Sequence, residues 1–440
     1  MNTVEEMETK LSRLSELSRG DRQMRFSTLI HLINEANLKV CYWELKRNKA
    51  PGVDWVDWGE YGQELDANIR RLVERMQRWE YRPQAVRRVY IPKANGGRRP
   101  LGIPALEDKI VQSMVTRILV AIYEPLFLEC SYGFRPGRSA HSALRVLDRE
   151  LYRSPSNWVV DADIRGFFDQ VDHRWLVRFL EEKIADRNLI RLIVRFLKAG
   201  IMEDGVFQSS EKGTPQGGIL SPLLANIYLH YVLDLWFIHR VKKKISGYST
   251  LIRYADDFII LTRYEKDARL ILNWLTDRLR EFGLELSAEK TRLIEFGRFA
   301  EERSQRKGKR PGTFDFLGFT HYITTSRGGG FKVGRRTAKG KYRGNLKRLN
   351  EWLKENRHRM PVDGLWKLLT AKLNGYYRYY GVSDNYGSLA RYSYQVTRLV
   401  FKWLNRRSQR ASYTWEAFNQ YLERHPLPQP RIYTNLHEYA

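Results

Sequence analysis

Apolar positions recur at two different periods along the chain, which predicts a mixture of helices and strands. Helices are predicted over residues 1–45, 66–79, 107–128, 221–236 and 264–282. Runs of β-branched and aromatic residues predict strands at 87–91, 158–164, 251–262 and 314–319. Because the two kinds of element do not alternate regularly and no internal repeat is visible, the pattern predicts an α+β fold.

The segments between these elements carry recognisable turn and cap residues. Asn95-Gly96-Gly97 predicts a hairpin turn after the first strand, and Ser139 is suited to be the N-cap of a further helix. In the N-terminal region, Phe26, Leu29, Ile30 and Ile33 recur at helical spacing. We expect a basic linker over 303–311 and a helical, basic region from about residue 346 onward.

The charge balance indicates that this globular protein binds polyanions. The 440 residues contain 76 Lys and Arg against 50 Asp and Glu, a net charge of +26. Residues 331–440 alone hold 22 basic and 7 acidic side chains, with many aromatic rings among them. Basic residues interleaved with stackable rings favour RNA as the partner, whereas a solvated basic face over an aromatic core is the simpler structural interpretation.

Composition also excludes several classes of protein. No run of 18 apolar residues is present, so we expect no membrane span. The first ten residues are polar and acidic, unlike a secretory signal, and two cysteines, Cys41 and Cys130, are too few for a disulfide framework or a four-thiolate zinc site. We therefore expect a cytoplasmic protein.

Two adjacent aspartates, Asp256 and Asp257, interrupt an apolar run that is otherwise typical of a buried strand. Burying two like charges is costly unless a cation neutralises them, so the pair favours a metal site. A hairpin tip with aspartate in the turn is an equally simple interpretation of the same residues.

The predicted strand 158–164 also carries acidic residues near its end. Asp161 and Asp163 share one face because strand side chains alternate with a period of two, and Asp169 follows shortly after. A carboxylate from this strand beside Asp256 and Asp257 would supply the oxygen ligands that Mg²⁺ prefers. Two such ions can stabilise both oxygens of a phosphoryl transfer. Spacing alone does not choose between Asp161, Asp163 and Asp169.

A glycine-rich loop, residues 213–222, opens the predicted helix 221–236. Glycine lets the backbone approach a ligand closely, and a helix N-terminus favours anions. A tight structural turn is the commoner meaning of such a loop.

Taken in order, these motifs resemble those of the bacterial group II intron-encoded reverse transcriptase/maturases. The resemblance extends over about residues 35–425. The matching stretches are 87–93, 100–104, 131–141, 163–168, 213–222, 254–257, 286–290 and 316–319, followed by the Gly-aromatic segment 375–380 and the basic segment 402–408.

The resemblance implies a right-hand polymerase of fingers, palm and thumb, with an antiparallel-sheet palm and a helical, basic thumb called domain X. The expected division is an N-terminal helical extension (1–45), fingers (46–150), palm (151–330), thumb or domain X (331–425) and a short C-terminal tail (426–440). In this family domain X grips intron RNA and promotes splicing. The alternative is that its aromatic residues merely pack the thumb helices together.

The resemblance also implies roles for the acidic residues. Asp163, Asp256 and Asp257 match the triad that holds two Mg²⁺ ions, for which Mn²⁺ can substitute, and Asp161 and Asp169 are then structural. Lys290 matches a proposed general acid that protonates the departing pyrophosphate. The competing interpretation of Lys290 is an exposed lysine on a loop.

Further positions match the substrate-binding residues of the family. Phe168 matches a steric gate that would clash with a ribose 2′-hydroxyl and so select dNTPs. Gln216 matches a residue that touches the incoming nucleotide. Arg87, Lys93 and Arg99 match finger positions that contact the template or the triphosphate, and the alternative for them is a solvated basic hairpin.

The sequence departs from the family pattern in two respects. Trp55 follows the turn at residues 52–54, where many relatives carry glycine. The sequence contains neither paired cysteines nor a His-Asn-His cluster of the kind found in a nuclease domain. We expect no self-encoded endonuclease, so integration would need a primer from elsewhere, such as a replication fork.

The expected function is an RNA-directed DNA polymerase of a group II intron that also binds the intron RNA, assists its splicing and supports retrohoming. Its partners would be the intron RNA, an RNA template, a DNA primer or target, and dNTPs, with no membrane. Two alternatives stay open. One is an RNA-binding splicing cofactor with dispensable polymerase activity, against which the intact aspartates argue. The other is a stand-alone relative that serves phage defence or DNA repair.

Overall fold

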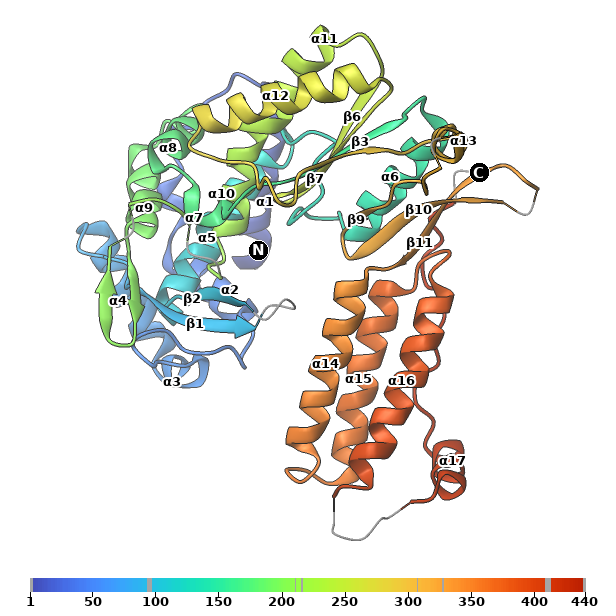
Figure 1. The fold of residues 1–440 in the computed structure, drawn as a ribbon. Helices are drawn as coiled ribbons and strands as arrows, with labels where there is room; N and C mark the ends of the chain where they lie inside the picture. The colour runs from blue at the N-terminus through green and yellow to red at the C-terminus, as the bar shows by residue number, and fades with distance from the viewer. Residues whose placement is uncertain are drawn as a thin grey trace.

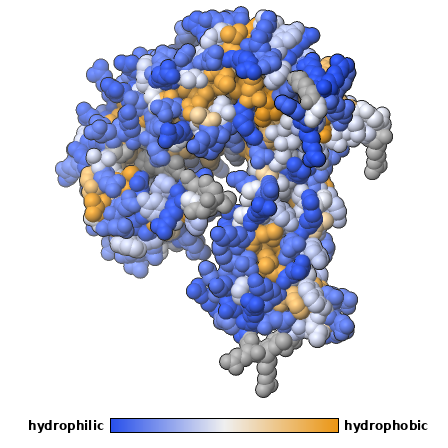
Figure 2. Space-filling view, viewed as in Figure 1, coloured by the Kyte–Doolittle hydropathy of each residue, from blue (hydrophilic) through white to orange (hydrophobic). Residues whose placement is uncertain are grey.

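The structure, a computed structural model, describes residues 3–92, 97–209, 211–214, 217–306, 308–326, 328–407 and 413–437. Two parts are distinct in Figure 1: a large lobe with mixed helices and strands, and a column of long helices below a small sheet. The space-filling surface is hollowed between the lobe and the column (Figure 2). The α+β class predicted for a polymerase with fingers, palm and thumb is confirmed.

The N-terminal half of the lobe is mainly helical. Its helices are α1 (Thr3–Gly20), α2 (Glu35–Glu44), α3 (Trp58–Gln63), α4 (Leu65–Gln77) and α5 (Leu106–Tyr123). The prediction of helix through residues 1–45 is wrong between α1 and α2, where the described backbone has a β-bridge at Phe26 and a 3₁₀ turn, Ile30–Leu32. The carboxylate of Asp186 accepts the N–H groups of Leu29 and Ile30, so tertiary contacts override the helical spacing.

The first sheet has the strand order β2-β1-β4-β5 and joins two strands from the range predicted as fingers to two from the range predicted as palm. The predicted strand is β1 (Val86–Pro92), paired antiparallel with β2 (Arg98–Ile103). β4 (Ile201–Glu203) adds to β1 in parallel and pairs with β5 (Val206–Gln208). The predicted turn at residues 95–97 falls almost wholly outside the described residues, which resume at Gly97.

The palm sheet has the order β6-β7-β3-β8, and every pair in it is antiparallel. β3 (Trp158–Asp163) agrees with the predicted strand 158–164, and β8 (Arg292–Glu295) is the edge strand beside it. The predicted strand 251–262 is two strands, β6 (Ser249–Tyr254) and β7 (Asp257–Thr262), so the hairpin interpretation of its acidic pair describes the backbone correctly.

Both faces of the palm sheet are buried, which explains why its strands read as continuous apolar runs. Val160, Phe258 and Ile260 pack in one core with helix α12 (Glu265–Glu281). Their neighbours Val159 and Ile259 pack in a second core that contains helix α6 (Ala140–Arg153) and extends into the thumb. Because side chains alternate along each strand, one face of the sheet packs into the core of the lobe and the other face packs into the core that extends into the thumb. The sheet therefore joins the lobe to the thumb.

The remaining helices of the lobe surround this sheet. They are α7 (Phe167–Gln170), α8 (His173–Glu181), α9 (Arg187–Leu197), α10 (Ser221–Leu229), α11 (Lys242–Lys244), α12 and α13 (Ala300–Arg306). Ser139 caps α6 by accepting the N–H of Ser142, as predicted. The predicted helix 221–236 changes to π-helical turns at His230–Asp234 and Phe237–Val241. The expected linker at 303–311 is helical up to Arg306.

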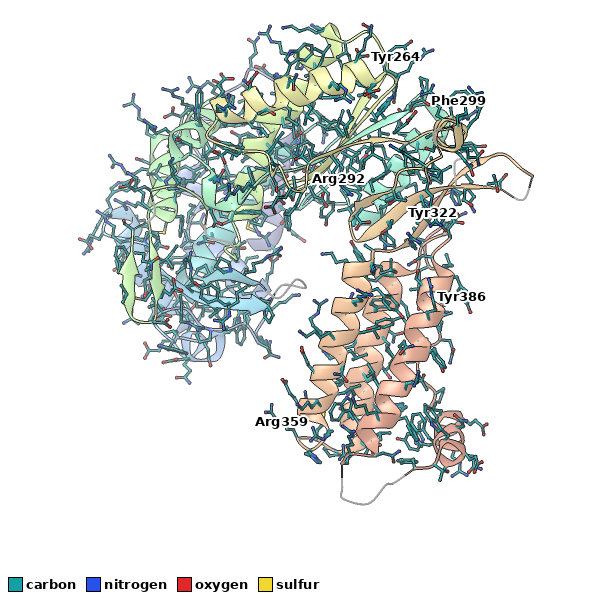
Figure 3. The ribbon with its side chains drawn as sticks, in the orientation of Figure 1. Tyr264, Arg292, Phe299, Tyr322, Arg359 and Tyr386 are labelled. Atoms are coloured by element: carbon teal, nitrogen blue, oxygen red, sulfur yellow. The ribbon has the colours of Figure 1, made fainter. Side chains whose placement is uncertain are left out.

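A small sheet of β9 (Phe314–Phe316), β10 (Phe319–Thr325) and β11 (Phe331–Thr337) precedes the helices of the thumb. Three long helices follow, α14 (Lys339–Asn356), α15 (Val362–Tyr380) and α16 (Tyr386–Leu404), and then α17 (Trp415–Arg424) at the lower end (Figure 1). Arg359 lies at that lower end, far from the sheet (Figure 3). Tyr376 and Tyr392 stack at 3.7 Å between ring centroids, so these rings do pack the thumb helices together.

The segment after α17 returns to the top of the thumb, where the C-terminus lies beside β10 and β11 (Figure 1). Thr434 bridges to Val382, and Leu436 is fully buried. His437 contacts Asp148 of α6 at 2.9 Å and Asp384 of the α15–α16 loop at 3.0 Å. Arg335 and Lys332 of β11 pair with the same two aspartates. This charge cluster connects α6, β11, the α15–α16 loop and the C-terminal segment.

Among the described residues, no helix is both long enough and apolar enough to span a bilayer.

The charge cluster makes the stability of the thumb junction depend on pH. Hydrogen bonds to Asp148 and Asp384 raise the pKa of His437 to about 9. A histidine pKa raised on folding adds stability that is complete below about pH 6.5 and is lost as pH rises through about 9. We expect His437→Gln to cost about 1 kcal/mol near pH 6, since the imidazole is partly exposed, and much less near pH 10.

Denaturant unfolding of both proteins at the two pH values measures this difference. His358→Gln, at an exposed histidine of the thumb, is the matched control. A His437→Gln penalty that is equal at both pH values would contradict the ionic role.

Candidate active site

Three of the predicted acidic residues meet at one end of the palm sheet. Asp163 is the last residue of β3, Asp257 is the first residue of β7, and the two lie directly opposite each other in the antiparallel pair. Tyr254 and Asp257 close the β6–β7 hairpin, which leaves Ala255 and Asp256 as its two-residue turn. Such turns need positive φ, which Ala255 adopts at 56°.

The carboxylates at this end of the sheet repel one another. Burial raises the pKa of Asp257 to about 7, and the charges of Asp161, Asp256 and Asp163 contribute to the rise. Burial also raises the pKa of Asp256, and the charge of Asp163 adds to this effect, whereas Arg99 and Lys290 oppose it. The site therefore concentrates negative charge and attracts cations.

Two cations already pair with the carboxylates of β3. The ammonium of Lys290 lies 2.7 Å from Asp163 Oδ2. Arg292, directly across from Asp161 on β8 and labelled in Figure 3, donates to Asp161 Oδ2 at 2.7 Å. The N–H of Ser287 donates to the carbonyl of Asp163, which fixes the loop that carries Lys290. Lys290 is thus an exposed loop lysine that reaches the acidic cluster.

The donor set suits a hard divalent cation. Mg²⁺ prefers carboxylate oxygens, and a cation offsets the repulsion that raises the pKa of Asp257. Within the described ranges, no group of three or more His, Cys, Asp or Glu side chains is already arranged to hold a metal ion. A metal would compete with the Lys290 ammonium for Asp163, and Asp256 and Asp257 are the other residues able to hold it.

A buried ion pair lies beneath the turn. Arg253 and Asp234 are both fully buried, and the guanidinium reaches the two carboxylate oxygens at 2.7 and 2.5 Å. Its remaining donors go to Asn226, Ser131 and the carbonyl of Ala255. Because Ala255 precedes Asp256, this network fixes the acidic turn to the core of the palm.

The glycine-rich loop packs against Phe168. The N–H of Thr214 donates to the carbonyl of Phe168 at 2.7 Å, and a Cβ on Gly213 would lie 2.8 Å from the same oxygen. A Cβ on Gly217 would lie 2.6 Å from the carbonyl of Gly102 on β2. The loop is therefore held between α7 and the fingers, with Phe168 half-buried at its edge. Gln216, with Pro215, lies outside the described residues.

The three finger residues lie in different surroundings. Arg99 is exposed on β2 and is close enough to lower the pKa of Asp256 by its charge. Arg87 at the start of β1 donates to the carbonyls of Pro51 and Gly52 and lies over the ring of Trp55. Lys93 lies outside the described residues. The structure thus brings Arg99 toward the acidic cluster, whereas the hydrogen bonds of Arg87 go to the neighbouring turn.

A groove of about 680 Å³ leads from Asp257 along the thumb. Leu317 and Gly318 of the β9–β10 turn line it near the palm, and the N–H of Leu317 stabilises the Asp257 carboxylate. Further along, basic and tyrosine side chains of α14 and α15 line it, among them Lys341, Arg348, Lys372, Tyr376 and Tyr379. The groove joins the acidic cluster to a cationic and aromatic surface.

Sequence analysis missed Arg253, Asp234 and Arg292. Arg253 and Asp234 stand within apolar runs, and a charged residue in such a run must be paired when it is buried. That feature marks each residue, but nothing in the sequence indicates that the two belong together. Arg292 could be recognised only from the register of β3 against β8.

The chain is similar in sequence to several known proteins. Residues 91–321, just over half of the chain, match the family model described as reverse transcriptase (RNA-dependent DNA polymerase). The group II intron-encoded protein LtrA of Lactococcus lactis subsp. cremoris is 35% identical over 64% of this chain and 56% of its own length. Protein YkfC of Escherichia coli (strain K12) is 34% identical over 60% of this chain and 77% of its own length.

A shorter match is to nuclear intron maturase 4, mitochondrial, of Arabidopsis thaliana, 31% identical over 29% of this chain and 16% of its own length. The chain thus spans just over half of the length of LtrA and a smaller part of the maturase.

Breaking the buried ion pair should destabilise the palm. Asp234→Asn leaves the Arg253 charge buried without its partner, which costs about 3–5 kcal/mol. The double variant Asp234→Leu with Arg253→Met removes both charges and should be more stable than the single variant. Urea unfolding of the three proteins measures this, and an Asp234→Asn protein as stable as the unmodified chain would show that the pair is not needed.

Proposed function

Since this chain belongs to the reverse transcriptase family, among relatives that include group II intron-encoded proteins, we propose that it is an RNA-directed DNA polymerase that also binds a group II intron RNA, assists its splicing and supports retrohoming. The observation that carries the proposal is the antiparallel register that puts Asp163 opposite Asp257, with Asp256 in the adjoining turn.

In this proposal Asp163, Asp256 and Asp257 hold two Mg²⁺ ions, which Mn²⁺ can replace. When bound, the ions would lower the pKa of the primer 3′-hydroxyl and neutralise charge on the departing pyrophosphate. The mutual repulsion of the carboxylates supports this role, because a site that concentrates negative charge gains most from divalent cations. Asp161 is neutralised by Arg292 and serves to shape the cluster.

Other side chains would position the substrates. Arg99 and Lys93 would contact the template or the triphosphate, and the effect of the Arg99 charge on Asp256 supports this role for Arg99. Phe168 would exclude a ribose 2′-hydroxyl, and Gln216 would contact the incoming nucleotide. Lys290 would deliver a proton to pyrophosphate, and its contact with Asp163 places its ammonium beside the acidic cluster. Arg87 would act on the template through the turn that it supports.

The thumb would hold the nucleic acid. The groove that begins at Asp257 carries Lys341, Arg348 and Lys372, which can neutralise phosphates as a duplex leaves the active site. Exposed rings such as those of Tyr386, labelled in Figure 3, and Tyr394 remain free of the thumb core and suit RNA bases. The same basic surface would bind the intron RNA for splicing.

The acidic triad gives the decisive experiment. Asp256→Asn and Asp257→Asn should each lower primer extension on an RNA template with Mg²⁺ on the order of 10³-fold, because each removes a charge from the metal site. Asp169→Asn, at an exposed aspartate on α7, is the matched control and should extend normally.

Steady-state extension rates measure this, and Asp256→Asn or Asp257→Asn proteins that extend at the unmodified rate would refute the proposal. A splicing assay on the Asp256→Asn protein separates the two roles, since RNA binding should survive the substitution. Loss of splicing in a folded Asp256→Asn protein would count against an independent maturase role.

The proposed gate at Phe168 gives a selectivity test. Phe168→Val removes most of the ring, so incorporation of rNTPs relative to dNTPs should rise about 10–200-fold while dNTP incorporation falls little. Single-nucleotide extension with matched rNTP and dNTP substrates measures the ratio. Phe167→Leu, at the buried neighbouring ring, is the control and should leave the ratio unchanged. An unchanged ratio in Phe168→Val would assign nucleotide selection to another residue.

A further inference from the structure

Trp55 combines two features that both lower stability. Its backbone has a φ of 61°, in the left-handed region that bulky side chains rarely adopt. Its side chain is 67% exposed, the largest exposure among the exposed large apolar side chains of the described residues. A residue that is strained and also leaves an indole in solvent is not explained by packing, and such strain is typical of sites that bind a ligand.

The ring is nevertheless held firmly. The guanidinium of Arg87 lies 4.6 Å from the ring centroid of Trp55. The same guanidinium donates to the carbonyl of Pro51 at 2.7 Å and of Gly52 at 3.1 Å. A Cβ on Gly52 would lie 2.4 Å from Cα of Ala105, so this turn is packed tightly against the start of α5. The indole is therefore presented on a rigid support, which lowers the entropy cost of binding.

The chain segment from Trp43 to Trp58, which contains Trp55, is aromatic and basic. Trp43 is 59% exposed and meets Trp58 edge-on, and Arg47 lies 4.6 Å from the ring of Trp58. Lys46 and Lys49 add exposed charge to the same segment. Rings for stacking beside cations for phosphates are the pattern by which proteins bind single-stranded nucleic acid.

The position in the fingers identifies which strand would reach this surface. Arg87 belongs to β1, and the paired strand β2 carries Arg99, whose charge acts on Asp256. A single strand that runs along this hairpin toward the acidic cluster therefore passes the segment that contains Trp55. In a polymerase, the strand that enters the active site unpaired is the template.

We propose that Trp55 is a stacking platform for an unpaired base of the RNA template ahead of the primer terminus. The inference rests on the proposed polymerase function and adds to it the surface that receives the single-stranded template. Arg87 is the positioning residue that holds the ring, and the stack does not depend on which base is present, since every base has a flat face.

Two substitutions in the full chain test this. The probes are a blunt RNA–DNA hybrid and the same hybrid with a single-stranded 5′ RNA overhang. Trp55→Gly should weaken binding of the overhang hybrid about tenfold, the usual effect of removing one stacking ring, and leave the blunt hybrid unchanged. Trp55→Phe, which keeps a ring, should retain most of the overhang affinity.

The melting temperature of the Trp55→Gly protein should change in the opposite direction to its affinity for the overhang hybrid. Glycine adopts positive φ without strain, so Trp55→Gly should raise the melting temperature while it weakens overhang binding. A purely structural tryptophan would instead lose stability and affinity for both hybrids together, which would overturn the inference.

Unchanged overhang binding by Trp55→Gly, in a protein whose unmodified form extends primers, would also overturn it and favour a protein partner for this surface. Failure of the unmodified protein to extend any primer would refute the proposed polymerase function instead, and the overhang measurement would still decide the role of Trp55.

Discussion

The buried pair of Arg253 and Asp234 is the interaction on which the arrangement of the active site depends. Both charges are fully buried, and burying them is favourable only because every part of the guanidinium contacts an acceptor: Asp234, Asn226, Ser131 and the carbonyl of Ala255. Asn226 in turn donates to Gly133. One side chain thus ties helix α10, the π-helical turn, the segment near residue 131 and the β6–β7 hairpin together, and the turn with Asp256 cannot move independently of the core.

This rigidity matters because the repulsion between the carboxylates destabilises their arrangement at the end of the sheet. The pKa of Asp257 near 7 reflects burial together with repulsion by Asp161, Asp256 and Asp163. Left to itself, such a cluster would separate or bind protons. The palm sheet resists this because both of its faces are packed, against α12 on one side and α6 with the thumb core on the other. Lys290 and Arg292 offset part of the charge, and the remainder is what a divalent cation would neutralise.

The sequence predicts those features that local patterns encode and misses those that depend on distant pairing. The strand before Asp163 and the amphipathic helix at 65–77 follow from periodicity, and Ser139 follows from cap chemistry. The break between β6 and β7 could not be decided from the sequence, because the acidic pair fits both a hairpin tip and a metal site in one strand, and strands buried on both faces show no alternation that would choose between them. The non-helical segment around Leu29 depends on Asp186, far along the chain. Choosing Asp163 over Asp161 and Asp169 required the family resemblance, since register with Asp257 is not visible in one strand alone.

The residues with left-handed backbone show how strain is distributed in this fold. Ala255 adopts it to close the two-residue turn before Asp256, and Leu317 adopts it where its N–H meets Asp257. Asp204 lies in the tight β4–β5 turn, and Asp384 is held by Lys332 and His437. Each of these has a local turn or an ion pair that holds it. Trp55 also lies in a local turn, since the carboxylate of Asp54 accepts the N–H of Val56 across it, and like Phe134 it combines a left-handed φ with an exposed ring. Its indole extends into solvent, where its ring contacts the guanidinium of Arg87. Backbone strain at a residue whose large aromatic side chain is left exposed is typical of sites that contact an external partner.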